Sequence, residues 1–337
     1  MQLRQGLRVL RRAADEVQVG VDPRWAVRIA GLRSEHVDRL VRSRDGQVGD
    51  LVPAPSLAAL RTVGVLRAPG AARRRVRDEL LPEALAHGLV RADGDGAEAV
   101  RRRARATVAV VGLDRAGATV ASTLAAAGVG TLLLDDPAPV GPADLAGPVS
   151  VAELGAPRAR ALADGLTRTV PQTRVRVPGG LRAVLEAGPD VVVTAATDVT
   201  DPATALALVS ADVAHLPVAS READALVGPF VVPQAPGADP QACLRCLDLH
   251  HADADPAWPR VLAQLAAGGR ARAPGTGPTA ALAAVAGGLA AAEVLAHLDG
   301  EAPRTRGAQY EIAVPSAAPR LRRWAAHPRC GCAALSG

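Results

Sequence analysis

The four cysteines of the chain stand in two close pairs, and this spacing constrains the fold more than any other feature of the sequence. Cys243 and Cys246 form a CxxC pair, Cys330 and Cys332 form a CxC pair, and 83 residues separate the two pairs. Four thiolates brought together by a fold make a tetrahedral site that is typical of structural zinc. A redox-active CxxC pair is the alternative. We therefore predict that the chain brings both pairs together around one zinc ion.

Strands alternate with helices from Thr107 onward. The predicted strands cover residues 107–111, 131–134 and 190–196, and the predicted helices end at Ala127 or cover residues 157–169 and 202–211. This alternation is typical of βαβ units, in which each helix connects two parallel strands. We therefore predict an α/β domain with a doubly wound, mostly parallel, Rossmann-like sheet.

The turn after the first of these strands has the pattern of a nucleotide-binding loop. Gly112 opens the turn, Gly117 follows it, and Asp136 stands at the end of the second strand. In such units the glycines permit a tight turn, the helix N-terminus offers N–H groups to phosphate, and the acid binds ribose hydroxyls. Asp114 occupies the place of the usual middle glycine, and its charge has the wrong sign for a phosphate. The pattern supports the fold and leaves intact nucleotide binding open.

The first ninety residues carry a smaller α+β pattern. Alternating apolar residues on either side of a turn at residues 22–24 predict a β-hairpin. Short helices are predicted to begin at Ser34 and Ser56, and a third covers residues 79–90. A hairpin with short helices resembles a winged-helix module. A small appendage that only packs is the alternative.

A polar stretch over residues 91–105 separates the two patterns. It contains the basic run from Arg101 to Arg103, which we interpret as a solvated linker rather than a phosphate contact. We therefore predict two domains, a winged-helix-like module over residues 1–95 and a Rossmann-type domain with the cysteine site over residues 96–337.

Composition and charge exclude several classes of protein. The net charge of +5 is small for 337 residues, and aromatic residues make up 1% of the chain. A DNA-binding function is therefore the weakest hypothesis, and nucleic acid is not an expected partner. The apolar stretch from Thr279 to Leu298 is rich in Ala and Gly and contains Glu293, which indicates a packed core helix. With no apolar signal core at the N-terminus, we expect a cytoplasmic protein without a membrane span.

His250, His251, Asp253 and Asp255 follow the first cysteine pair closely. They could form a second metal cluster. The favoured interpretation is a solvated loop that leads to Trp258, where an apolar ring anchors the next helix.

From Thr107 to Cys332 the sequence resembles the ThiF/MoeB/HesA family, relatives of the ubiquitin-activating enzymes. The resemblance rests on the order of VAVVG, AAAGVGTLLLDD, VVVTAATD, the CLRC pair, an Ala-rich helix and the closing cysteine pair. Members bind ATP and magnesium and adenylate the C-terminal carboxylate of a small carrier protein or peptide. They also carry a structural zinc and are usually homodimers. The resemblance implies the same activity, cofactors and partners here.

The resemblance also assigns roles to individual residues. Gly112 and Gly117 match the outer glycines of the loop, and Asp136 matches the ribose-binding acid. Arg158 stands in place of the usual Lys and keeps its charge, while Asp198 matches the acid that holds magnesium. We therefore take Arg158 and Asp198 as the candidate catalytic residues.

Several positions depart from the family pattern. Asp114 and Arg115 replace two glycines, Ala138 replaces an acid, Asp144 replaces Asn, and Gly147 replaces Arg. Two hypotheses follow, an adenylyltransferase with a partly degraded nucleotide site and an inactive relative that binds a peptide or protein. The N-terminal module faintly resembles the winged-helix leader-peptide-binding domains of peptide-modification pathways, which implies a precursor-peptide partner.

Overall fold

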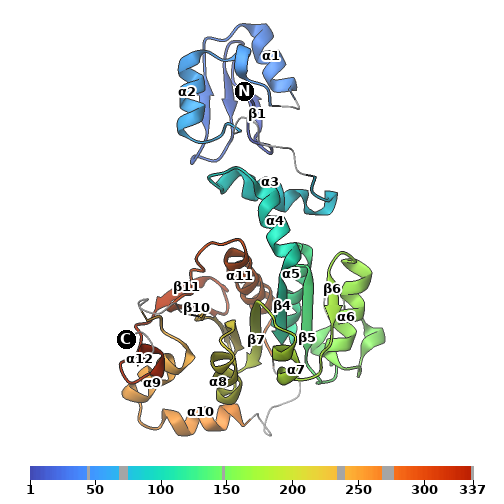
Figure 1. The fold of residues 1–337 in the computed structure, drawn as a ribbon, viewed down its shortest axis with the longest axis vertical. Helices are drawn as coiled ribbons and strands as arrows, with labels where there is room; N and C mark the ends of the chain where they lie inside the picture. Colours follow the sequence, from blue (N-terminus) through green and yellow to red (C-terminus); the bar gives the residue numbers. More distant parts are fainter. Residues whose placement is uncertain (44–45, 68–74, 146–148, 234–239, 268–276, 335–337) are drawn as a thin grey trace. The chain divides into compact units, whose positions relative to one another are not determined.

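The chain forms two compact units, Met1–Arg101 and Arg102–Gly337. The computed structural model describes residues 1–43, 46–67, 75–145, 149–233, 240–267 and 277–334. Figure 1 shows the ribbon of both units, and each is described here by itself. Helix α4 (Gly96–Arg105) runs through the stretch that the sequence analysis interpreted as a linker.

The first unit contains a three-stranded antiparallel sheet with the strand order β1-β2-β3. Its elements are β1 (Val9–Arg11), β2 (Val17–Val19), β3 (Val27–Ile29), α1 (Ser34–Arg42), η1 (Gly49–Leu51), α2 (Ala54–Thr62), η2 (Asp78–Leu80) and α3 (Leu81–Val90). The pairing of β2 with β3 confirms the predicted hairpin. The three helices lie within two residues of their predicted positions. The winged-helix identity of this unit stays a prediction.

The second unit is built on an eight-stranded sheet with the order β11-β10-β9-β8-β7-β4-β5-β6. The parallel strands are β4 (Thr107–Val111), β5 (Thr131–Asp135), β6 (Arg174–Arg176), β7 (Val191–Thr197) and β8 (Ala214–Ser220). Antiparallel pairing adds β9 (Asp224–Val227), β10 (Ala308–Ala313) and β11 (Pro319–Arg323). The prediction of a mostly parallel α/β sheet is confirmed.

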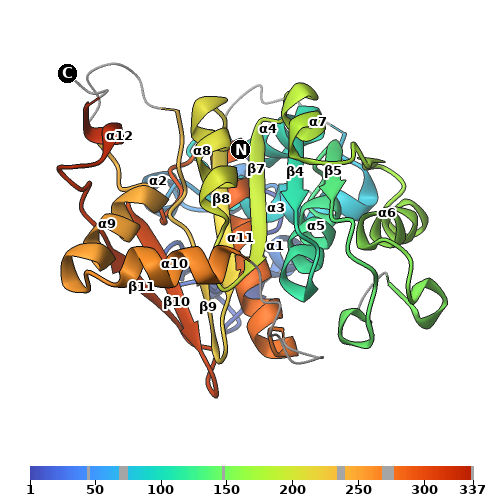
Figure 2. The ribbon, with the colours of Figure 1, turned by 90° about the horizontal axis from the view of Figure 1, so that it is seen from below.

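Helices cover both faces of this sheet, as Figure 2 shows. The helices on one face are α5 (Arg115–Ala126), α6 (Arg158–Thr169) and α11 (Ala280–Leu298), and those on the other are α7 (Leu181–Glu186) and α8 (Pro202–Ser210). Val108 and Val110 of β4 pack with α5 and α11, whereas Ala109 packs with α7 and α8. Because both faces of β4 are buried, its sequence is an unbroken apolar run rather than an alternating one.

Arg103 corrects the interpretation of the basic run as a solvated linker. Its guanidinium is fully buried and donates two hydrogen bonds to the Asp299 carboxylate, from Nε at 2.9 Å and from Nη2 at 2.6 Å. Asp299 is itself buried and forms the C-cap of α11. A bidentate ion pair with both partners satisfied can be buried, whereas an unpaired charge cannot. The pair fastens the end of α4 to the end of α11.

Helix α11 confirms the prediction of a packed core helix. By length and composition alone it could cross a membrane, and 44% of its most apolar window is buried inside the protein. It packs on α5, β8, β9 and β10. Glu293 in its middle is buried, and its carboxylate accepts hydrogen bonds from the backbone N–H and the hydroxyl of Thr305, at 2.7 Å and 2.6 Å. A carboxylate satisfied in this way belongs to a protein core.

The crossing of α11 with α5 generates a stability prediction at Gly287. A Cβ atom added there would lie 2.6 Å from the Cβ of Thr119 and 2.8 Å from the carbonyl oxygen of Ala116. Gly287→Ala should therefore lower the free energy of unfolding by about 1–3 kcal/mol. The neighbouring Gly288 has no atom within 4 Å of its added Cβ, so Gly288→Ala should raise stability by about 0.5–1 kcal/mol through helix propensity. Urea unfolding of both variants checks the crossing, and equal effects would contradict it.

Candidate functional site

A cavity of ≈ 260 Å³ lies at the carboxyl ends of β4, β5 and β7. Gly112 lines it from the β4–α5 turn, Asp135 and Asp136 from the end of β5, and Thr194 and Thr200 from β7 and the loop that follows. The chain leaves β4 toward β5 on one side, and β7 returns to the other side of β4. Open α/β sheets bind ligands where the strand order reverses in this way. The cavity is therefore the candidate ligand site of the second unit.

Two glycines allow the β4–α5 turn to pack against β7. Gly112 has a φ of +85°, and a Cβ atom there would lie 1.9 Å from the carbonyl oxygen of Ala195. A Cβ atom at Gly117 would lie 2.1 Å from the carbonyl oxygen of Gly112. Gly112 lines the cavity, whereas Gly117 is buried in α5 and supports the turn. Nucleotide binding by either glycine stays a prediction.

Asp114 is the N-cap of α5, a role that sequence reasoning did not foresee. Its Oδ1 atom accepts hydrogen bonds from the backbone N–H groups of Ala116 at 2.9 Å and Gly117 at 3.1 Å. Burial raises the pKa of Asp114, and these hydrogen bonds and the Arg158 charge act in the opposite direction. The free N–H groups at a helix N-terminus are those that bind phosphate in a nucleotide loop. Here the Asp114 carboxylate already accepts hydrogen bonds from two of these N–H groups.

Arg158, the first residue of α6, lies between two carboxylates. Its Nε atom donates to Oδ2 of Asp144 at 2.9 Å, and its Nη1 atom lies 3.4 Å from Oδ2 of Asp136. Burial alone would lower the pKa of Arg158, yet the two carboxylates hold it above its ordinary value. Asp136 also accepts from the backbone N–H groups of Leu113 at 2.8 Å and Ala138 at 2.9 Å. The structure thus brings Arg158 and Asp136 into contact, which is necessary if both residues belong to one binding site.

Asp198 directly follows the last residue of β7. Its φ of +68° places it in the left-handed region, which Asp tolerates better than most residues, and its N–H donates to the carbonyl oxygen of Ser220 at 2.8 Å. Thr200, two residues later, lines the cavity. Among the residues that the structure describes, the four cysteines are the one group of His, Cys, Asp or Glu placed to hold a metal. A magnesium role for Asp198 therefore stays a prediction.

Sequence reasoning missed four polar residues of the cavity lining. These residues are Thr194, Thr200, Asp201 and Thr204, from β7, the following loop and the start of α8. Asp201 also caps α8, where its Oδ2 atom accepts hydrogen bonds from the N–H and the hydroxyl of Thr204 at 2.9 Å and 3.0 Å. The signal that could have found them is the run of Thr and Asp directly after a buried strand. Gly147, singled out for the loss of an Arg, lies outside the described residues.

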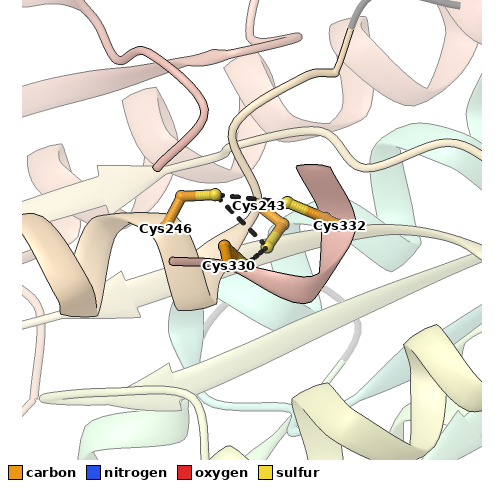
Figure 3. Close-up of side chains that lie close together, drawn as sticks. All are labelled: Cys243, Cys246, Cys330 and Cys332. Atoms are coloured by element: carbon orange, nitrogen blue, oxygen red, sulfur yellow. Dashed lines mark hydrogen bonds between the residues drawn. The ribbon is translucent and has the colours of Figure 1, made fainter. Parts of the chain in front are cut away.

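The two cysteine pairs meet, as predicted, and Figure 3 shows their side chains pointing toward one another. Cys243 caps α9 (Leu244–Ala254) and Cys246 lies in its first turn, while Cys330 and Cys332 lie at the start of α12 (Gly331–Ala334). The Sγ atom of Cys243 lies 3.8 Å from that of Cys246 and 3.7 Å from that of Cys330. Zn–S bonds of about 2.3 Å in a tetrahedron imply S–S separations of about 3.8 Å. The Sγ atoms of Cys246 and Cys332 lie 3.3 Å apart, and all four Sγ atoms lie within 4.8 Å of one another. The cysteines are therefore close enough together to hold one metal ion after small adjustments of their side chains.

The surroundings favour the thiolate form of Cys246, whereas burial and the neighbouring thiols raise the pKa of Cys243 and Cys332. The Cys243 thiol donates a hydrogen bond to Cys246, and with the backbone N–H of His327, 3.3 Å from Cys246 Sγ, it lowers the pKa of Cys246 to about 4. Nε2 of His327 lies 2.9 Å from Oδ2 of Asp253. Such outer contacts hold metal ligands in place.

The segment between the cysteine pair and Trp258 was predicted wrongly as a loop. His250, His251 and Asp253 lie within α9, while Trp258 begins α10 (Trp258–Ala266), as expected. The rings of His250 and His251 pack on Trp324, with centroids 5.7 Å and 5.4 Å apart. The segment is therefore helical, and its half-buried histidine rings contact a tryptophan from the far end of the chain.

Comparisons with known proteins agree with this architecture. The family model described as the ThiF family matches residues 89–334. E. coli MccB with MccA-N7isoASN is 14% identical, with a TM-score of 0.69 over 98% of this chain and 99% of that chain. E. coli MccB with ATP gives the same identity and TM-score over 100% of this chain and 99% of the other. PaaA is 15% identical, with a TM-score of 0.61 over 79% of this chain and 90% of its own. No curated protein matches significantly.

Proposed function

Because this chain belongs to the ThiF family, we propose that it is an ATP-dependent adenylyltransferase acting on the C-terminal carboxylate of a peptide or small carrier protein. The observation that carries the proposal is the meeting of Asp136 and Arg158 beside the cavity at the reversal of strand order. In the reaction, a carboxylate oxygen of the peptide attacks the α-phosphorus of ATP and pyrophosphate leaves. The product is an acyl adenylate.

Each predicted site residue has a role in this proposal. Asp136 accepts hydrogen bonds from the ribose hydroxyls, and Gly112 and Gly117 let the backbone approach the nucleotide. Arg158 supplies positive charge to the phosphates as negative charge develops during the reaction. Asp198 binds the magnesium ion that accompanies ATP. Because Arg158 is paired with Asp144 and Asp136, it has to exchange these partners for the phosphates.

The second candidate function is a peptide-binding relative that performs no chemistry. Asp114 favours it, because its carboxylate occupies N–H groups at the start of α5 and adds negative charge where a triphosphate would lie. Both candidates share the partner. MccB has been crystallised with MccA, and we propose a precursor peptide or small carrier as the partner of this chain. The homodimer, the cytoplasmic location and peptide binding by the winged-helix-like unit remain predictions.

Replacement of Asp114 tests how far the nucleotide site is weakened. Two like charges about 4 Å apart at an effective dielectric constant of about 20 repel by about 4 kcal/mol, which sets an upper limit of about a thousandfold in affinity. We expect weak or undetectable binding of magnesium-ATP by calorimetry, and tighter binding by Asp114→Gly. Glycine is also tolerated as an N-cap, so the fold should lose only a few tenths of a kcal/mol. Tight binding of magnesium-ATP by the unmodified protein would contradict the weakened site.

Pyrophosphate exchange distinguishes the two candidate functions. With saturating magnesium-ATP and peptides bearing a free C-terminal carboxylate, an adenylyltransferase incorporates labelled pyrophosphate into ATP, and the same peptides as C-terminal amides give no exchange. Arg158→Ala should abolish exchange, whereas Arg158→Lys, which restores the usual ammonium, should retain part of it. A peptide that binds without supporting exchange establishes the inactive relative instead.

We also propose that the cysteine centre holds one structural zinc ion. The cysteines come from two short helices, α9 and α12, that are distant in sequence. Four protein ligands close the coordination sphere, which is typical of structural rather than catalytic zinc. The metal would hold the C-terminal segment against the start of α9.

Metal analysis of the purified protein checks this proposal. We expect about one zinc per chain, and Cys246→Ala should lose the metal and destabilise the second unit, because metal binding is coupled to folding. Chelation should reproduce that loss in the unmodified protein. A metal-free preparation with four thiols that titrate before unfolding would favour the redox-active alternative.

A further inference from the structure

The cavity beside Asp136 has an unusual balance of charge for a nucleotide site. Within the part of the chain that the structure describes, its lining residues include Asp135, Asp136, Asp201 and three threonines, and no Arg or His. Each of the three carboxylates already accepts at least one hydrogen bond from the chain itself. Phosphate groups need cations or free N–H groups, whereas carboxylates and hydroxyls suit the hydroxyl groups of a sugar. The lining therefore offers no positive charge to an anionic ligand.

The groups nearby that could bind a phosphate already have partners within the chain. Asp114 accepts from the N–H groups of Ala116 and Gly117, and Arg158 is paired with Asp144 and Asp136. Arg115, which follows Asp114 in the chain, donates to the carbonyl oxygen of Ala143. Asp114 is close enough to Asp136 and Arg158 for both charges to act on it. Three carboxylates thus share one guanidinium, and the position of a phosphate already holds negative charge.

The volume and position of the cavity indicate which class of ligand it could bind. Its volume of ≈ 260 Å³ lies just below the range of about 300–1,000 Å³ typical of pockets for drug-sized ligands. The acid directly after the second parallel strand, Asp136, is the position that binds ribose in doubly wound sheets. A nucleoside has the ribose hydroxyls for this acid and carries no charge to be repelled by Asp114.

We propose that this cavity selects an uncharged nucleoside over nucleoside phosphates, with the Asp114 carboxylate standing in the place of a phosphate. The proposal rests on the proposed function in taking the cavity as the nucleotide site. It adds an order of affinity, in which adenosine binds most tightly and each added phosphate weakens binding. ATP is then a weak ligand whose phosphates must displace Asp114 and Arg158 from their partners.

Calorimetry with adenosine, AMP, ADP and ATP, at one magnesium concentration and ionic strength, tests this order on the full chain. We expect adenosine to bind at least about tenfold more tightly than ATP. Asp114→Asn keeps an N-cap oxygen and removes the charge, while Asp114→Gly also frees the N–H groups. Both should tighten ATP binding, Asp114→Gly more strongly, and both should leave the dissociation constant of adenosine within about twofold. The matched control is Asp164→Asn, which removes an exposed charge on α6 outside the cavity lining. It should leave the dissociation constants of both adenosine and ATP unchanged.

Several outcomes would overturn the proposal. The first is that ATP binds as tightly as adenosine. The second is that adenosine shows no saturable binding with a dissociation constant of about 1 mM or below. The third is that the Asp114 variants change the affinity for both ligands by the same factor. A cationic probe such as spermidine binding more tightly than adenosine would instead assign the carboxylates to an amine ligand. Adenosine binding without pyrophosphate exchange leaves this inference standing and removes the proposed activity. Pyrophosphate exchange together with tight ATP binding supports the proposed activity and contradicts this inference.

Discussion

The close packing of the β4–α5 turn against β7 is the constraint on which the candidate site depends. Added Cβ atoms at Gly112 and Gly117 would lie 1.9 Å and 2.1 Å from backbone oxygens, so no other residue fits either position without moving a strand or a helix. This packing places the start of α5 beside the end of β5, where the Leu113 N–H can reach Asp136. The turn, the ribose-type acid and the cavity therefore form one unit.

The same turn shows how a binding loop can retain its fold while its chemistry changes. A helix N-terminus needs acceptors for its N–H groups, and a phosphate or a capping carboxylate satisfies that need equally well. With Asp114 in place, α5 is capped by its own chain. Arg158 is similarly neutralised by Asp144 and Asp136 rather than by a ligand. Stability of the unliganded site and affinity for a phosphate are thus in direct competition.

Two contacts between segments that are distant in sequence stabilise the second unit. The buried pair of Arg103 with Asp299 joins the helix that precedes β4 to the C-terminus of α11. The cysteine centre joins the start of α9 to α12 near the C-terminus. Neither contact touches the cavity lining. The residues that make these two contacts are therefore different from those that line the cavity.

The sequence by itself determined the parallel core, the glycine turn and the grouping of the cysteines, because each depends on local periodicity or on spacing along the chain. Strands β4, β5 and β7 lie within one residue of their predicted bounds. It did not reveal β6, β8, β9, β10 or β11. Two of these, β6 and β9, have only three and four residues, which is too short for a strand to be recognised from its pattern alone. Only the tertiary structure decided the partners of charged residues. Arg103 and Asp299 are 196 positions apart, and no local pattern distinguishes this buried arginine from its solvated neighbours. Asp114 was visible as a misplaced charge, but its conversion into a helix cap, and the pairing of Arg158 with Asp144, arise from hydrogen-bond geometry that exists only once α5 and α6 have packed on the sheet.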